Sequence, residues 1–310
     1  MARRFHINGT EQFGYSMVNR YLHSFYVYMN TVQRICQLYQ YASVYDLKGY
    51  VAHFCYIRLK SFDSFLKVLI EHRDYVTANS IMRMLGDSVA VFYLVYMEPD
   101  INYRFLRHSL YVLDGCEESL KVLPENSIQE GSLPEEERIQ ANEDIYFNRE
   151  HRMRLMREAQ ELLDHSPLRQ KDELAFNRIV EDRNWKFKEF KNYNRKRVFD
   201  NQYKWRELYE KIDYVDQFDL LSYLSQYAHG LSMSNLVIEL SEQNFDGPIG
   251  EALGILDRMN TYVLEYFTEE NLYIIQGLLE PEIRDKILAC YDEKHRPTIA
   301  EWEKNFTIHV

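Results

Sequence analysis

Hydrophobic positions recur every three or four residues along most of the chain, which is the spacing of one face of an α-helix. Few segments alternate with a period of two, and only 11 glycines and 7 prolines occur among the 310 residues. The pattern therefore predicts an all-α protein. The predicted helices cover residues 11–45, 50–72, 79–97, 102–123, 135–164, 169–181, 203–212, 216–241, 249–267, 270–279 and 282–291.

The polarity of these predicted helices changes twice along the chain. Helices in residues 1–123 and 214–310 carry apolar faces suited to a shared core, whereas residues 124–213 are rich in charged side chains. Turn-forming residues cluster at 124–134, where the first change occurs. We therefore predict an up-and-down helical bundle in two halves, interrupted by a charged helical insertion that forms an arm.

The segment from Asn79 to Met97 differs from the other predicted helices. From Val89 onward it is apolar on all sides, as a helix buried within a core must be. One turn earlier it carries Arg83 and Asp87, four residues apart and therefore on one face. A buried charge needs a partner. The pair either sets the register of packed helices, binds a carboxylate or phosphate through an arginine that Asp87 orients, or reaches solvent.

A second polar stripe is predicted on the helix that contains residues 221–230. Ser222, Ser225, Gln226 and His229 have the spacing of one helical face. A histidine within reach of a serine can act as its general base, so Ser225 and His229 are candidate catalytic residues. The alternative is a solvated stripe in which His229 caps the helix end. The candidate ligand-binding residues are Arg83, Asp87, Tyr223 and Tyr227.

Charge is distributed unevenly along the chain. The net charge is -11, yet nine bases and two acids give residues 183–206 a charge of +7. Seven aromatic side chains are interspersed with these bases, a composition typical of surfaces that bind single-stranded nucleic acid. A flexible charged arm, or a basic surface that contacts an acidic part of the same or a second subunit, would have the same composition. The candidate nucleic-acid contacts are Lys186, Lys188, Lys191, Arg195, Lys196 and Arg197.

Common catalytic and metal-binding motifs are absent from the sequence. There is no GxxxxGK[ST], GxGxxG, GxSxG or HExxH, and no histidine lies three residues after a glutamate. We therefore expect no metal site and no cofactor. The four cysteines form no CxxC, which is typical of a reducing compartment. The N-terminus lacks a signal-peptide core and the run Val89–Met97 is too short to cross a bilayer, so we expect a cytoplasmic protein without membrane contact.

Two blocks of sequence carry a recognisable pattern. The first block runs from Arg58 to Leu94 and contains S-x-x-S and R-x-L-x-[DE], and the second contains L-S-x-x-x-H-G. Together they resemble a bacterial family of all-helical proteins of unknown function, although Tyr223 lies nearer the serine than in the family. The resemblance covers about a third of the chain. It implies an all-helical fold in which Arg83, Asp87 and His229 converge, and it implies no activity. The matching residues are Ser61, Ser64, Arg83, Leu85, Asp87, Ser225, His229 and Gly230.

Three hypotheses for the function follow from these patterns. The first is a non-catalytic protein whose pocket near Arg83, Asp87 and His229 binds a small anionic or nucleotide-like ligand, or a partner. The second is a metal-independent RNase or phosphoesterase-like enzyme, with His229 as general acid or base and Arg83 holding the phosphate. The third is a non-catalytic interaction module that forms a homodimer through its aromatic helices. The basic segment adds nucleic acid as a candidate partner.

Overall fold

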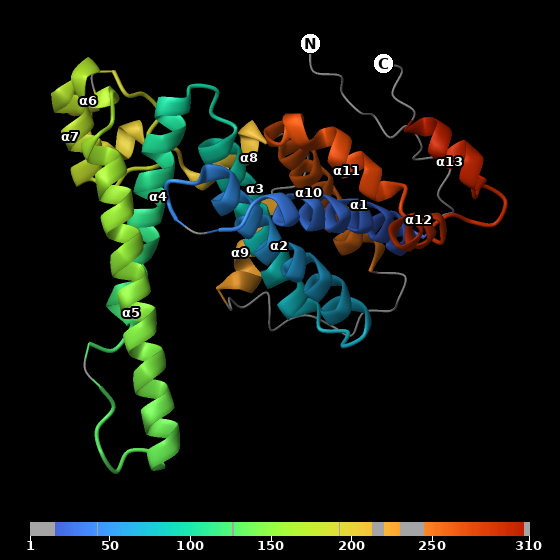
Figure 1. Cartoon of the computed structure of the whole chain (residues 1–310), viewed down its shortest axis with the longest axis horizontal. Coiled ribbons are helices and arrows are strands. Elements are labelled where there is room, and N and C mark those ends of the chain that lie inside the picture. The colour runs from blue at the N-terminus through green and yellow to red at the C-terminus, as the bar shows by residue number, and fades with distance from the viewer. Residues whose placement is uncertain are drawn as a thin grey trace. The chain divides into compact units, whose positions relative to one another are not determined.

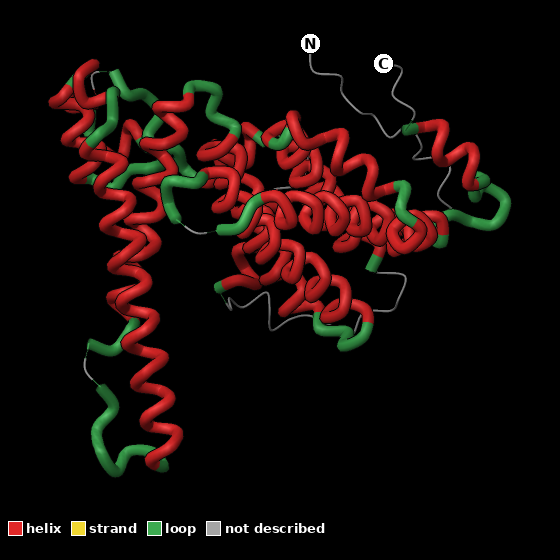
Figure 2. The backbone as a smooth tube through the Cα atoms, in the orientation of Figure 1, coloured by secondary structure: helices red, strands yellow, loops and turns green. Residues whose placement is uncertain are grey.

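The computed structural model describes residues 16–41, 43–125, 127–191, 193–212, 220–229 and 245–306. Within these ranges the regular structure consists of thirteen α-helices and short 3-10 turns, without a strand (Figure 2). The predicted all-α fold class is confirmed. An isolated antiparallel bridge joins Phe187 to Gln202. Over the same ranges, none of the helices combines the length and the hydropathy that a membrane span requires.

The chain forms two compact units, each assembled from segments that are distant in sequence. Unit 1 contains residues 1–40, 51–90 and 209–310, and unit 2 contains residues 41–50 and 91–208. The predicted boundary at residue 123 does not coincide with these limits, because the helix before it packs along the helix after it. The residue limits of the two units fall within three helices that Figure 1 labels, namely α2 (Leu47–Ile70), α3 (Tyr75–Tyr96) and α8 (Trp205–Lys211).

Unit 1 is organised around its first helix, against which three later helices pack. Two hydrogen bonds from this helix reach distant segments: the Tyr21 hydroxyl donates to the carbonyl of Phe62 at 2.8 Å, and the Asn30 amide donates to the carbonyl of Ile274 at 2.8 Å. Both side chains are buried, so these bonds satisfy polar groups inside the core. The helices of unit 1 besides α2 and α3 are α1 (Met17–Leu38), α9 (Leu220–Ala228), α10 (Asp246–Tyr266), α11 (Asn271–Leu278), α12 (Pro281–Leu288) and α13 (Ile299–Asn305).

Unit 2 consists of a long pair of helices and a compact irregular segment. α4 and α5 pack along each other, and α6 and α7 follow after a turn. The aromatic side chains of residues 185–193 then return to the side of α4, where the Arg107 guanidinium donates to the carbonyl of Trp185 at 2.9 Å. The helices of unit 2 besides α8 are α4 (Ile101–Val122), α5 (Glu135–Asp164), α6 (Leu168–Lys171) and α7 (Glu173–Glu181).

Several helix boundaries differ from the predicted ones, and capping side chains explain most of the differences. The predicted helix 11–45 is shorter, since Ser16 caps α1 and Tyr39 takes an extended conformation after Leu38. α3 begins before residue 79, because the Asp74 carboxylate accepts the N–H of Thr77 at 3.0 Å.

Two further segments differ in other ways. The predicted helix 169–181 is interrupted at Asp172, which caps α7. Of the predicted helix 216–241, α9 is described, and the remainder lies outside the described residues. The pattern did not predict α13, which begins with a capping box between Thr298 and Glu301.

Candidate functional site

The polar side chains of α3 belong to one hydrogen-bonded cluster in unit 1, which we call the polar cluster: Arg83, Asp87, Tyr209 and Ser225. Arg83 forms an ion pair with Asp87 through Nη1. The same nitrogen donates to the Tyr209 hydroxyl at 3.0 Å, and Nε donates to the Ser225 hydroxyl at 3.4 Å. The Tyr209 hydroxyl in turn donates to the Asp87 carboxylate at 3.1 Å. Side chains from α3, α8 and α9 therefore hold one guanidinium.

The sequence of α3 explains why the cluster forms at this place. Arg83 and Asp87 are one turn apart, so their side chains meet, while Leu85 and Val89 are buried on other sides of the helix. Gly86 lies between Arg83 and Asp87 in the sequence. A Cβ at this position would come within 2.5 Å of the Tyr209 hydroxyl oxygen. The glycine therefore lets Tyr209 approach the backbone of α3. The sequence patterns did not indicate Tyr209. The available signal was the glycine inside an apolar helix, which is typical of a close approach by another side chain.

Burial shapes the electrostatics of the cluster. The side chain of Arg83 is 11% exposed and that of Asp87 is 28% exposed, so the ion pair reaches the surface through its carboxylate end. Burial lowers the pKa of the Arg83 guanidinium, and the Tyr209 hydroxyl opposes this shift. An arginine remains protonated at neutral pH despite such a shift. The cluster therefore presents a fixed cation with one carboxylate partner.

The two candidate catalytic residues occupy different positions relative to this cluster. The Ser225 hydroxyl belongs to it, since it accepts from Arg83 and donates to the carbonyl of Leu221 at 2.7 Å. His229 follows α9, is exposed, and donates its backbone N–H to the carbonyl of Ser225 at 3.2 Å. Among the described residues, no hydrogen bond joins the His229 ring to the Ser225 hydroxyl. The arrangement thus brings Arg83, Asp87 and Ser225 together and leaves His229 beside them.

Tyr223 and Tyr227 form a separate group of hydroxyls in unit 1. The Tyr223 hydroxyl lies 2.5 Å from the Tyr75 hydroxyl. The Tyr227 hydroxyl donates to the Tyr223 hydroxyl at 3.0 Å. Burial raises the pKa of Tyr223 and of Tyr227. These three rings connect the start of α3 to α9, so the two candidate ligand contacts contribute to the packing that positions Ser225.

The candidate nucleic-acid segment forms part of the core of unit 2. Four of its seven aromatic side chains are buried, namely Trp185, Phe187, Phe190 and Tyr193. These rings are therefore not on the surface that a stacked base would contact.

The bases of this segment divide into two groups. Lys188 pairs with Glu207 at 2.5 Å and Lys196 with Glu189 at 2.6 Å, while the Lys186 ammonium lies over the rings of two tryptophans. The remaining candidate contacts are exposed: Lys191, Arg195 and Arg197. Nucleic-acid binding by the segment stays a prediction that now concerns these three side chains.

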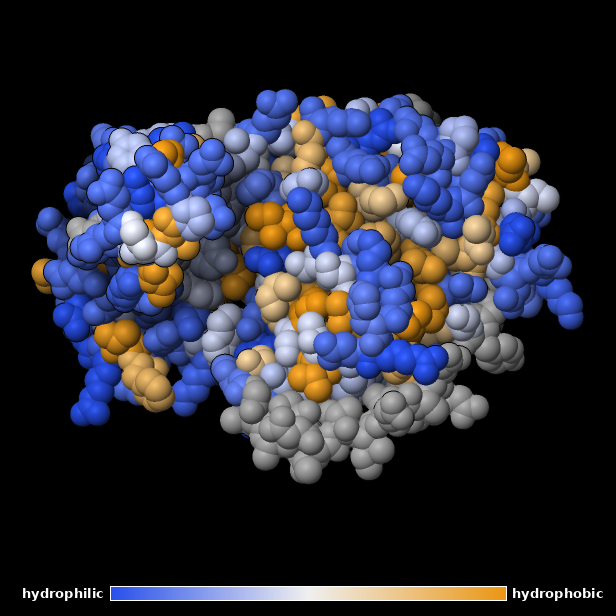
Figure 3. Space-filling model, turned by 90° about the horizontal axis from the view of Figure 1, so that it is seen from below, coloured by the Kyte–Doolittle hydropathy of each residue, from blue (hydrophilic) through white to orange (hydrophobic). Residues whose placement is uncertain are grey.

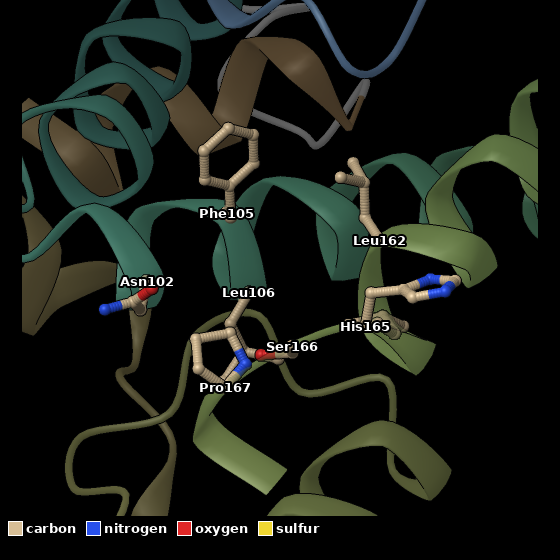
Figure 4. Close-up of a pocket in the computed structure, with 8 residues that line it drawn as sticks. Asn102, Phe105, Leu106, Leu162, His165, Ser166 and Pro167 are labelled. Carbon is tan, nitrogen blue, oxygen red and sulfur yellow. The ribbon is translucent and has the colours of Figure 1, made fainter.

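Unit 2 also contains a small cavity between α4 and the end of α5 (Figure 4). Its volume is about 140 Å³, and most of its lining is apolar. None of the predicted site residues lies in it. The lining residues are Asn102, Phe105, Leu106, Leu162, Leu163, His165, Ser166 and Pro167.

Side chains suited to metal or redox chemistry are dispersed in the structure. The described part of the chain contains no group of three or more histidine, cysteine, aspartate or glutamate side chains arranged to hold a metal ion. Cys36, Cys55, Cys116 and Cys290 are all free thiols.

Comparison with known proteins returned no match among family models, curated proteins or solved structures. The resemblance to a bacterial helical family therefore stays a prediction.

Proposed function

We propose that the protein is a non-catalytic binding protein that takes the anionic group of a ligand, a phosphate or a carboxylate, at the polar cluster. The observation that carries this proposal is the guanidinium of Arg83, which side chains from three helices hold in place. An arginine that is already oriented loses less conformational freedom when an anion binds. Two exposed residues near Ser225 supply further contacts for a larger ligand. Ser222 lies on α9, and His229 directly follows it.

Energetics favour a functional role for the cluster over a purely stabilising one. Replacing a buried ion pair by well-packed apolar residues is often neutral or stabilising, by about 1–4 kcal/mol. Most of the buried side chains of α3 are apolar, with Leu85, Val89 and Phe92 fully enclosed. Apolar residues at positions 83 and 87 together would therefore suit the helix, and a charge pair kept at the expense of stability is typical of functional sites.

The hydrolase alternative receives less support from the same contacts. A serine nucleophile needs a base that accepts its proton. The Ser225 proton is directed to the carbonyl of Leu221, and its oxygen accepts from Arg83. Ser225 is thus a bridge between α9 and the guanidinium, which suits binding better than nucleophilic catalysis.

Thermal unfolding with simple anions tests the proposal. Phosphate, pyrophosphate and citrate serve as probes, and sodium chloride of equal ionic strength serves as the reference. A ligand at 100 times its Kd stabilises the folded state by about 2.7 kcal/mol, which raises Tm by several degrees. We expect the parent protein to show such a rise with at least one probe. Arg83→Met should lose the rise, and without a probe it should melt close to the parent, because the Asp87 carboxylate is partly exposed and keeps the Tyr209 hydroxyl as a donor.

Arg73→Met is the matched control, because Arg73 is an exposed arginine of the same unit. It should keep the response to the probe. A parent protein whose Tm is unchanged by all three anions overturns the proposal. An Arg83→Met variant that melts many degrees lower and responds like the parent assigns the cluster a structural role instead.

A further inference from the structure

The N-terminal two thirds of α5 bury no side chain. α5 has 30 residues, and its buried side chains are Leu155, Ala159 and Leu163, all in the last third. From Glu135 to Arg154 every side chain is exposed or half-buried. In proteins, helices obtain most of their stability from packing of an apolar face rather than from intrinsic propensity. This part of α5 therefore lacks the packing that stabilises most helices.

α4 accompanies α5 over only part of its length. The Arg149 guanidinium donates to the carbonyls of Leu123 and Pro124, each at 3.3 Å, just after α4 ends at Val122. Toward its N-terminus α5 continues past that point beside the connecting loop, as Figure 2 shows. There the loop is joined to the helix by two hydrogen bonds between Ile128 and Asn142. One side of the helix remains uncovered within unit 2.

Three large apolar side chains lie on the uncovered part, and we call them the α5 stripe: Ile139, Tyr146 and Phe147. They are 46%, 70% and 71% exposed. Residues 139 and 146 are two turns apart and therefore on one line, and the Phe147 ring stacks on His151 one turn later. Apolar side chains are exposed elsewhere too, as Figure 3 shows for one face of the molecule. A stripe on a stretch of helix that buries no side chain is different, because it marks a contact surface.

The charges along α5 change sign at the α5 stripe. Residues 135–147 contain five acids and one arginine, whereas residues 148–157 contain four arginines and one glutamate. Residues 135–147 therefore form an acidic stretch with a charge of -4, and residues 148–157 form a basic stretch with a charge of +3. Tyr146 and Phe147 lie at the boundary between them.

We infer that α5 pairs with α5 of a second copy of this chain in antiparallel orientation, with Tyr146 and Phe147 at the centre. An antiparallel pair places the acidic stretch 135–147 of each helix along the basic stretch 148–157 of the other, whereas a parallel pair places like charges together. The helix dipoles favour the same orientation. Both complementary surfaces are present on one helix, as a two-fold symmetric interface requires. A second copy is therefore the partner that this pattern fits.

The inferred register can be followed residue by residue. With the two-fold axis between positions 146 and 147, Glu136 of one chain faces Arg157 of the other, and both side chains are exposed. In the same register Arg154 faces Ile139, and its aliphatic stem covers that side chain. All of these residues belong to unit 2, so the inference is independent of the proposed anion site.

Sedimentation equilibrium of the full chain over a range of concentrations tests the inference. We expect the mass to rise from that of the 37.4 kDa monomer toward twice that value, and to fall again at high salt because salt screens the charge pairs. The double substitution of Tyr146→Ser and Phe147→Ser should weaken dimerisation at least tenfold, since exposed aromatic side chains at the centre of an interface contribute most. Leu174→Ser is the matched control, because Leu174 is 69% exposed on α7 of the same unit. Substitution of exposed side chains should leave the thermal midpoint of each variant near that of the parent.

Engineered disulfides test the orientation. In the antiparallel pair the two copies of residue 146 are neighbours, whereas residue 139 of one chain lies about 22 Å from residue 139 of the other, because 15 residues at 1.5 Å separate them. Disulfides require Cα atoms within about 7 Å. Tyr146→Cys should therefore form a covalent dimer under mild oxidation, and Ile139→Cys should not.

Three outcomes would overturn the inference. A chain that remains monomeric at every concentration contradicts dimerisation, and a dimer insensitive to the Tyr146 and Phe147 substitutions contradicts the surface. Equal cross-linking through positions 139 and 146 would indicate a parallel pair instead.

Discussion

Two buried arginines, one in each unit, differ in the groups that hold them. In unit 2, Arg107 is 5% exposed, donates to the carbonyl of Trp185, and lies 3.9 Å from the centre of the Phe187 ring. Glu98 is its carboxylate partner at 3.6 Å. In unit 1, Arg83 is more exposed, and its ion pair with Asp87 and its hydrogen bonds to Tyr209 and Ser225 are made to side chains near the surface.

The comparison shows that the kind of partner indicates the role of a buried charge better than burial does. A backbone carbonyl and an enclosed ring cannot move without the chain, so Arg107 fastens the irregular segment after α7 to α4. Burial lowers the pKa of Arg107 to about 10, with Glu98 opposing the shift. Hydroxyl and carboxylate side chains near the surface can exchange partners. Arg83 therefore suits ligand binding, whereas Arg107 suits structure.

The largest expected effect comes from removing the arginine of unit 2. Arg107→Met leaves the Trp185 carbonyl without its donor and removes the contact with the Phe187 ring. We expect the free energy of unfolding to fall by about 3 kcal/mol, because a buried carbonyl is left unsatisfied and a cation–π contact is lost. Urea unfolding measures it, with exposed Arg195→Met in the same segment as control. Equal stability of Arg107→Met and Arg83→Met would remove the distinction between the two sites.

A glycine substitution tests the packing of the polar cluster in unit 1. Gly86→Ala places a methyl group 2.5 Å from the Tyr209 hydroxyl oxygen and 3.2 Å from its ring carbon, so the tyrosine must move away from Arg83 and Asp87. We expect this overpacking to lower the free energy of unfolding by about 2 kcal/mol. Gly115→Ala in α4 is the control, because nothing lies within 4 Å of its added methyl group. The free energy of unfolding of that control should rise by about 0.5–1 kcal/mol, because alanine is more stable than glycine inside a helix. A gain for both variants in thermal unfolding would mean that Tyr209 does not approach α3 closely.

An effect that is absent at neutral pH, and that both units share, concerns two buried histidines. Burial lowers the pKa of His23 in unit 1 and of His108 in unit 2 from 6.5 to about 4. Between these values the unfolded chain binds more protons than the folded one, so stability is complete above pH 6.5 and falls as the pH approaches 4. Each histidine contributes about 1.4 kcal/mol for each pH unit in this window.

Replacement of one histidine isolates its share of this pH dependence. His108→Gln should make unfolding less dependent on pH between 6.5 and 4, the window set by the two pKa values of His108. Urea unfolding at several pH values measures the slope. Exposed His165→Gln in the same unit is the control and should leave the slope unchanged. A parent-like slope for His108→Gln would show that the ring is protonated in the folded state.

Sequence patterns predicted part of the candidate site and missed the rest for a physical reason. Arg83 and Asp87 were found because their spacing along one helix is a local property. Tyr209 could not be found in this way, since it meets Asp87 across 122 positions of sequence. The rings of residues 185–193 were candidates for stacking on nucleic acid, with a contact inside the protein as an alternative, and they are buried. A segment without a regular period does not reveal which side of each residue faces the core.

The sequence by itself determined that the chain is helical and where most helices lie, because helical periodicity and capping residues act over a few positions. The long charged helix α5 was predicted at the bounds it has, Glu135–Asp164. The tertiary structure alone decided which polar groups meet and how the chain divides. Unit 1 combines residues near 83 with residues near 209 and 225, and unit 2 folds its basic segment around Arg107. These outcomes depend on contacts between distant segments, whose burial and partners no local pattern contains.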